Sequence, residues 1–130
     1  MTDDELIRAF ESAELPGDRF THEAHVRVAW TYLSRHPFAE ALGRLDTALR
    51  RFADAKGASG KYHATITVAY MLLIAERLDA TPGLDWPAFA AGNPDLLSKS
   101  PSILERYYTN EVLQSERARR VFVMPEARSR

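Results

Sequence analysis

The strongest constraint on the fold is a helical repeat in the middle of the chain, enclosed by two sequence breaks. Large apolar side chains recur there at steps of four and three residues: Phe38, Leu42, Leu45, Leu49 and Phe52. This spacing puts them on one face of an α-helix. The repeat follows His36-Pro37, where the residue before the proline avoids helical geometry, and it ends near Gly57. We therefore predict an amphipathic helix, which must bury its apolar face against other elements.

Three further long helices are predicted at about residues 2–14, 22–35 and 61–79. Thr2 and Glu5 form a capping-box pattern, and Thr21 suits the N-cap of the second helix. Short helical segments are expected around 86–89, 93–95 and 101–108, followed by an extended tail at 121–125. No strand-like alternation persists through the long segments. The predicted fold is all-α: a compact bundle of four longer helices plus short C-terminal helices and an extended tail, in a single domain, 1–130.

Composition narrows the classes of function. The chain has 45% hydrophobic residues, no cysteine and a net charge of −1. The absence of cysteine excludes disulfides, thiolate metal sites and cysteine nucleophiles. A near-zero net charge favours neither nucleic acid nor an anionic membrane as a partner. The acidic, polar start does not resemble a signal peptide. A soluble cytoplasmic protein is expected, with no nucleic-acid or membrane partner, and a homo-oligomer remains open.

Charge is nevertheless distributed unevenly. Residues 1–24 carry a net charge of −5, and residues 114–130, which contain five arginines, carry +3. Two solvated segments that attract each other explain this pattern most simply. An arginine-rich tail that binds an anion is the alternative.

Three of the four histidines are predicted to meet at one end of the bundle. His22 and His25 stand three apart in the first turns of the second helix, so they share a face. If successive helices run antiparallel, the second and fourth are parallel, and His63 comes to the same level. The fourth histidine, His36, ends the second helix, where an imidazolium suits the helix dipole.

Several chemistries fit such a cluster. Burial near helix N-termini favours neutral imidazoles, which are required for metal ligation and for general-base catalysis. His22, His25 and His63 are therefore candidate ligands of a divalent metal, zinc or iron. A metal-free ligand pocket and purely structural hydrogen bonding are equally compatible with the pattern. Four neighbouring side chains of the fourth helix are candidate pocket residues: Tyr62, Thr65, Thr67 and Tyr70.

These segments resemble a family of small bacterial proteins that is itself uncharacterised. The resemblance rests on Phe20-x-His22-x-x-His25-x-x-x-Ala29-Trp30 and Tyr62-His63-x-Thr65-x-Thr67, with further matches at Asn93-Pro94-x-Leu96-Leu97, Arg106-Tyr107-Tyr108 and Ser115-x-x-Ala118-Arg119-x-x-Phe122-Val123-x-Pro125. It covers about residues 20–125 and implies an all-helical fold. It implies no activity, cofactor or catalytic residue. Glu126 stands where the family pattern suggests Asp.

The sequence thus predicts a small helical protein whose histidine-lined pocket binds a divalent metal or a small polar ligand. Whether it is an enzyme stays open, and its catalytic residues are unknown. The alternative is a non-catalytic interaction module, in which the histidines are structural and a helix face or the arginine-rich tail binds a protein.

Overall fold

Eight α-helices and three short 3₁₀ segments, with no β-strand, make up residues 1–126, the range that the computed structural model describes. The α-helices are α1 (Asp3–Glu11), α2 (His22–Arg35), α3 (Phe38–Ala55), α4 (Ala64–Ala80), α5 (Trp86–Gly92), α6 (Pro94–Leu97), α7 (Asn110–Leu113) and α8 (Glu116–Arg120). The 3₁₀ segments are η1 (Gly17–Arg19), η2 (Ser59–Lys61) and η3 (Ile103–Arg106). The all-α prediction is confirmed. The predicted division into four longer and several short helices is matched only approximately, because α5, with seven residues, is intermediate in length.

Local sequence signals explain where the helices begin. Thr2 and Glu5 form the predicted capping box of α1, with hydrogen bonds of 3.2 and 3.1 Å. Thr21 caps α2 through the Ala24 N–H. The fourth helix starts three residues later than predicted, because η2 occupies Ser59–Lys61 and the His63 side chain caps the helix.

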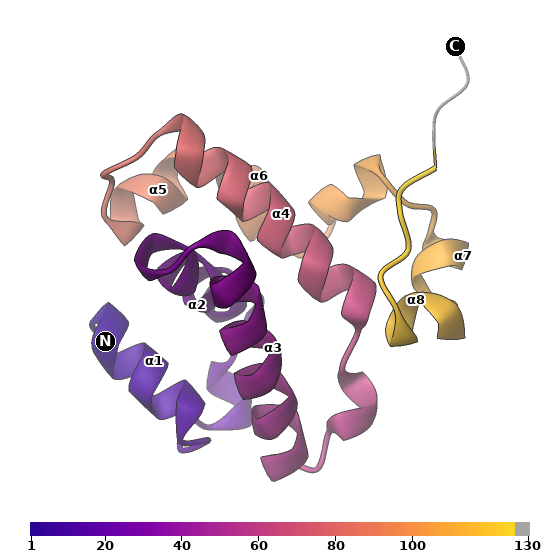
Figure 1. The fold of residues 1–130 in the computed structure, drawn as a ribbon, viewed down its shortest axis with the longest axis horizontal. Helices are drawn as coiled ribbons and strands as arrows, with labels where there is room; N and C mark the ends of the chain where they lie inside the picture. The colour runs from indigo at the N-terminus through magenta and orange to yellow at the C-terminus, as the bar shows by residue number, and fades with distance from the viewer. Residues whose placement is uncertain (127–130) are drawn as a thin grey trace.

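Helix α4 lies at the centre of the molecule. It contacts α2 and α3 on one side, and α8 and η3 on another. Figure 1 shows α4 crossing between the α1–α2–α3 group and the C-terminal helices α7 and α8. The buried apolar side chains form one continuous cluster that includes Phe10, Val28, Met71 and Phe89. In residues 1–126, no helix combines the length and apolarity needed to span a bilayer.

The acidic N-terminal segment pairs with α2. Asp3 accepts from Arg27 at 2.8 Å and Asp4 from Arg35 at 2.6 Å. Among residues 1–126, these ion pairs link the start of α1 to α2, while α1 also buries Leu6, Ile7 and Phe10. Arg128 and Arg130 of the arginine-rich tail lie outside the described residues, so the anion-binding alternative stays a prediction.

The segment after α8 is extended, as predicted. Thr65, which is fully buried in α4, donates to the Val121 carbonyl at 2.9 Å and accepts from the Val123 N–H at 3.0 Å. The Tyr108 hydroxyl donates to the Val123 carbonyl at 2.6 Å. Phe122 packs against the core, whereas Met124 is 72% exposed. The tail is therefore attached mainly by its main chain.

Candidate functional site

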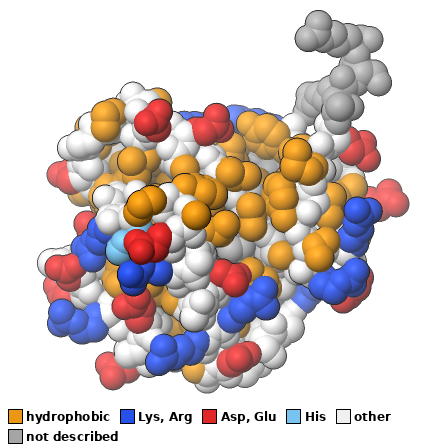
Figure 2. Space-filling view, in the orientation of Figure 1, with side chains coloured by type: hydrophobic (Ala, Val, Ile, Leu, Met, Phe, Trp, Pro, Cys, Tyr) orange, Lys and Arg blue, Asp and Glu red, His pale blue; other side chains and the backbone are white. Residues whose placement is uncertain are grey.

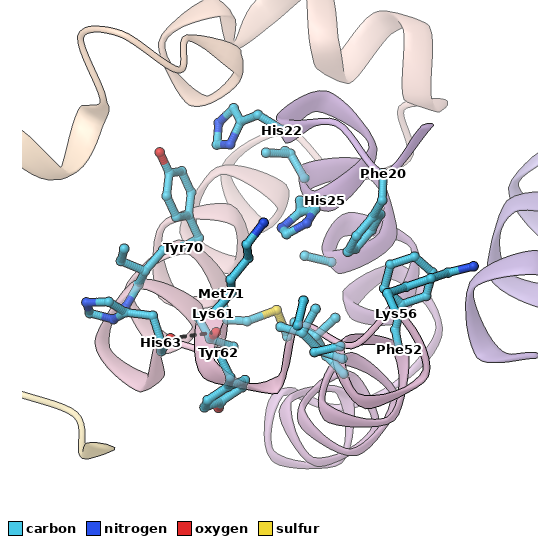
Figure 3. A pocket seen from close by; sticks show the side chains of 18 of the residues that line it. Phe20, His22, His25, Phe52, Lys56, Lys61, Tyr62, His63, Tyr70 and Met71 are labelled. Atoms are coloured by element: carbon cyan, nitrogen blue, oxygen red, sulfur yellow. Dashed lines mark hydrogen bonds between the residues drawn. The ribbon is translucent and has the colours of Figure 1, made fainter. Parts of the chain in front are cut away.

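A cavity of about 510 Å³ lies between α2, α3 and α4. Its wall is mostly apolar and includes Phe20, Val26, Ala29, Leu45, Leu49, Phe52, Met71 and Ile74. The polar side chains on the wall come from the start of α2, the end of α3 and the first half of α4 with the segment before it (Figure 3). A volume of this size is typical of pockets that hold small organic ligands.

His22, the first residue of α2, is fixed by the main chain of α6. Its Nε2 lies 2.9 Å from the Leu96 carbonyl oxygen. Because a carbonyl only accepts, Nε2 carries a proton and donates in this contact. The ring also meets Tyr70 edge-on, with centroids 5.2 Å apart. His22 thus connects the start of α2 to both α4 and α6.

His25, one turn further along α2, has a different environment. Its ring packs on Phe20 with centroids 3.7 Å apart, and it makes no hydrogen bond to any of residues 1–126. The side chain is exposed at the cavity, although enough protein atoms lie around the ring to reduce its hydration. This desolvation, helped by the nearby His22, lowers the pKa of His25 to about 4. His25 is therefore neutral at pH 7 and offers one donor and one acceptor to the cavity.

His63 is occupied at both ring nitrogens. As the N-cap of α4 it accepts from the Ile66 N–H through Nδ1 at 3.1 Å. Its Nε2 donates to the Leu113 carbonyl in α7 at 2.7 Å. Both nitrogens are satisfied by main-chain groups, so the ring joins α4 to α7 while only its side borders the cavity.

The structure does not bring the three predicted metal ligands together. Within residues 1–126, no three His, Asp or Glu side chains are grouped so that they could hold a metal ion. The reason is the relative position of the parallel helices. His22 faces Tyr70, which follows His63 by seven residues, or roughly 10 Å along a helix axis. Figure 3 shows His63 pointing away from His22 and His25.

Three of the four predicted pocket residues of α4 and its start line the cavity: Tyr62, Thr67 and Tyr70. The Tyr62 hydroxyl donates to Asp46, and the Arg50 guanidinium lies 3.9 Å from the Tyr62 ring centroid. The Tyr70 hydroxyl is 2.9 Å from the Ser102 hydroxyl. Burial raises the pKa of both phenols. Their hydroxyls serve neighbouring elements, so the two side chains contribute mainly ring surface to the cavity.

The two threonines have different places in the structure. Thr67 lines the cavity and donates to the main-chain carbonyl of His63 at 2.8 Å. Thr65 is absent from the cavity wall because its hydroxyl holds the C-terminal segment. The prediction of a pocket role for Thr65 therefore needs correction: it lies on the opposite side of α4, against residues 121–123.

Sequence reasoning missed two other kinds of cavity residue. One is the aromatic pair Phe20 and Phe52, whose ring centroids are 4.8 Å apart. The other is the pair Lys56 and Lys61, which flank the α3–α4 connection. The chain has three lysines in total, and two of them line this one cavity. The glycine-containing connection between them carries no recognisable motif. The only indication in the sequence was that two of the three lysines lie within six residues of each other.

Comparisons with protein-family models, curated proteins and solved structures give no match to this chain. The family resemblance drawn from the motifs therefore stays a prediction. Function has to be argued from the cavity itself.

Proposed function

We propose that this protein binds a small organic molecule in the cavity between α2, α3 and α4, with His25 as its polar anchor. One observation carries the proposal: His25 presents a neutral imidazole to an apolar cavity and has no hydrogen-bond partner among residues 1–126. His25 is exposed at this cavity, so its ring nitrogens are open to a hydrogen-bond partner from outside the chain. A bound molecule with a hydroxyl, carbonyl or carboxyl group would supply it.

His22 and His63 have structural roles, which leaves His25 as the histidine that is open to a ligand. His22 and His63 each use ring nitrogens on main-chain carbonyls, at 2.9 and 2.7 Å. They shape the cavity by fixing α6 and α7 next to α2 and α4. If the bound molecule is a substrate, the neutral His25 ring is placed to hydrogen-bond the reacting group, whereas its pKa of about 4 makes it a weak base at pH 7.

Calorimetric titration of the full chain with decanol tests this proposal. Decanol combines an apolar body with one neutral hydroxyl, and it should bind the wild-type protein with measurable affinity. His25→Leu should weaken binding about fivefold, the effect of losing one neutral hydrogen bond. His36→Gln is the matched control, because His36 lies at the far end of α2 and faces Glu40 at 2.8 Å.

A second pair of variants tests the location. Ala53 lines the cavity from α3, whereas Ala55 is exposed and does not. Ala53→Phe should fill the cavity and abolish decanol binding, and Ala55→Phe should leave it unchanged. Equal affinity of both variants would refute binding at this site.

Self-association through α4 is a second candidate function. Ile66 and Leu72 of α4 are 36% and 43% exposed, and Val121 beside them in the adjacent tail is 43% exposed. Figure 2 shows apolar side chains gathered over α4 and the C-terminal segment. Contiguous apolar surface of this kind favours protein contacts. Sedimentation of the wild type and of Leu72→Lys tests self-association. A wild-type dimer that is lost in the variant supports this function, and a monomeric wild type rejects it.

A further inference from the structure

We propose that the ligand of this cavity is an apolar organic acid, whose carboxylate binds at Lys61 and Lys56 next to His25. This inference rests on the proposed function and names the chemical class of its ligand. Three features of the cavity lead to it: the sign of the charge on its wall, the direction of the Lys61 side chain, and the separation of polar from apolar wall.

The charged side chains on the cavity wall all have one sign. Among residues 1–126, Lys56 and Lys61 line it, and no Asp or Glu side chain does. The protein as a whole has a net charge of −1, so the positive wall is a local property and not a consequence of a basic chain. Asp46, on α3 near the cavity, accepts from Tyr62 and pairs with Arg50 at 3.2 Å. Charge of a single sign on a concave, partly apolar wall attracts ligands of the opposite sign.

Both lysines are available to a ligand. Neither ammonium forms an ion pair within residues 1–126. In Figure 3 the Lys61 side chain points toward the centre of the cavity, on the side of His25, whereas Lys56 points outward past Phe52. The Lys56 ammonium lies 5.4 Å from the Phe52 ring centroid. Lys61 is therefore the principal anion contact and Lys56 a secondary charge at the edge.

The rest of the wall defines the body of the ligand. Leu45 and Leu49 from α3 face Met71 and Ile74 from α4 across the same cavity. An acid with an apolar chain or ring can bury its body there while its carboxylate stays with the lysines. The neutral His25 ring complements this arrangement, because its one N–H can donate to a carboxylate oxygen. An amine of the same shape would meet Lys61 with like charge.

The test compares decanoate, decanol and decylamine, titrated into the full chain at pH 7 below their micelle concentrations. Decanoate should bind about threefold more tightly than decanol at low salt, a difference expected for an ion pair with the exposed Lys61 ammonium. Added salt should narrow this difference, because accessible charges are screened. Decylamine should bind more weakly than decanol.

Lysine variants assign the effect to the site. Lys61→Met should reduce decanoate affinity to the level of decanol while leaving decanol affinity unchanged, which also shows that the variant is folded. Lys99→Met is the matched control: it removes the same charge from an exposed lysine away from the cavity, and it should preserve the preference for decanoate.

The outcomes separate the two proposals. Binding of decanol with no preference for decanoate, or a preference that survives Lys61→Met, overturns the organic-acid inference and leaves the proposed function standing. Failure of all three probes to bind overturns both.

Discussion

Two histidines of one chain illustrate how strongly neighbours decide the role of a residue. His63 has both ring nitrogens bound to main-chain groups, and it acts as a helix cap and a link between helices. His25 has the same side chain but borders a cavity, with Phe20 against its ring. Sequence patterns treated the two alike, because hydrogen-bond partners such as the Leu113 carbonyl, fifty residues away, leave no local signal.

The lowered pKa of His25 predicts a pH dependence of stability. Its pKa falls from 6.5 to about 4 on folding, so the unfolded chain binds the proton at higher pH than the folded protein does. The contribution to stability is complete above pH 6.5 and is lost as the pH falls toward 4. This contribution to stability is smaller than the full pKa shift implies, because the ring stays partly hydrated.

Urea unfolding between pH 7 and 4 measures this effect. Between pH 7 and 4, the free energy of unfolding of His25→Gln should fall less than that of the wild type. His36→Gln keeps His25, so it should retain the part of the decrease that comes from protonation of His25. An NMR titration of the His25 ring gives a direct check. A pKa near 6.5 in the folded protein would contradict the assignment of a desolvated, neutral ring at neutral pH.

Thr65 provides a second prediction for a single residue. Thr65→Val removes both hydrogen bonds to Val121 and Val123, and it should destabilise the protein by about 1–3 kcal/mol, because two part-buried main-chain groups lose their partners. Thr67→Val is the control on the same helix. The His63 carbonyl that Thr67 contacts still accepts the helical Thr67 N–H at 3.1 Å, so a smaller loss is expected. Urea unfolding of the two variants compares them directly.

At the scale of elements, a charged cluster joins α4 to the short helices that follow it. Arg77 makes two hydrogen bonds to Asp95, both 2.9 Å long, and a third to Asn93 at 2.8 Å. Arg106 of η3 adds a contact to Asp95 at 3.2 Å. The cluster fixes α6, whose Leu96 carbonyl in turn fixes His22. The geometry of the cavity thus depends on an interaction outside it.

Asp95→Asn should destabilise the protein by roughly 1–2 kcal/mol at pH 7, because it removes the negative charge that Arg77 binds with two hydrogen bonds. The expected loss is modest, since about a third of each of the two side chains is exposed to solvent. Hydrogen bonding to Arg77 lowers the pKa of Asp95 from 3.8 to about 2. Its stabilising effect is therefore present above pH 3.8 and lost as the pH falls through 2.

The difference in unfolding free energy between wild type and Asp95→Asn should accordingly close between about pH 4 and 2. Asp79→Asn, an exposed position on α4, should show little effect at any pH. A difference that persists unchanged at pH 2 would mean that Asp95 acts through packing and not through its charge.

At the scale of the whole molecule, the C-terminal segment closes the fold across α4. Residues 121–123 contact Thr65 near the start of α4, and the Tyr108 hydroxyl holds Val123 from the other side. Phe122 adds an apolar contact with the core. In Figure 1 this segment runs beside α8, on the side of α4 away from α1.

Truncation tests this closure. A chain that ends at Arg120 should be markedly less stable in thermal unfolding, because it loses Phe122 and leaves Thr65 and Tyr108 without their partners. A chain that ends at Pro125 keeps all of these contacts and should unfold close to the wild type. Equal stability of both truncated chains would show that the segment contributes little to the fold.

The sequence by itself determined the all-α class and the starts of α1 and α2, since periodicity and capping residues such as Thr2 and Thr21 act over a few positions. It also predicted a pocket at the starts of the second and fourth helices, and the cavity wall includes residues of both segments. Only the tertiary structure decided the register between those helices. A shift of about two turns along α4 set His22 against Tyr70 and separated His63 from the other two rings. Side-chain packing between distant segments fixes that register, and no pattern within one helix encodes it.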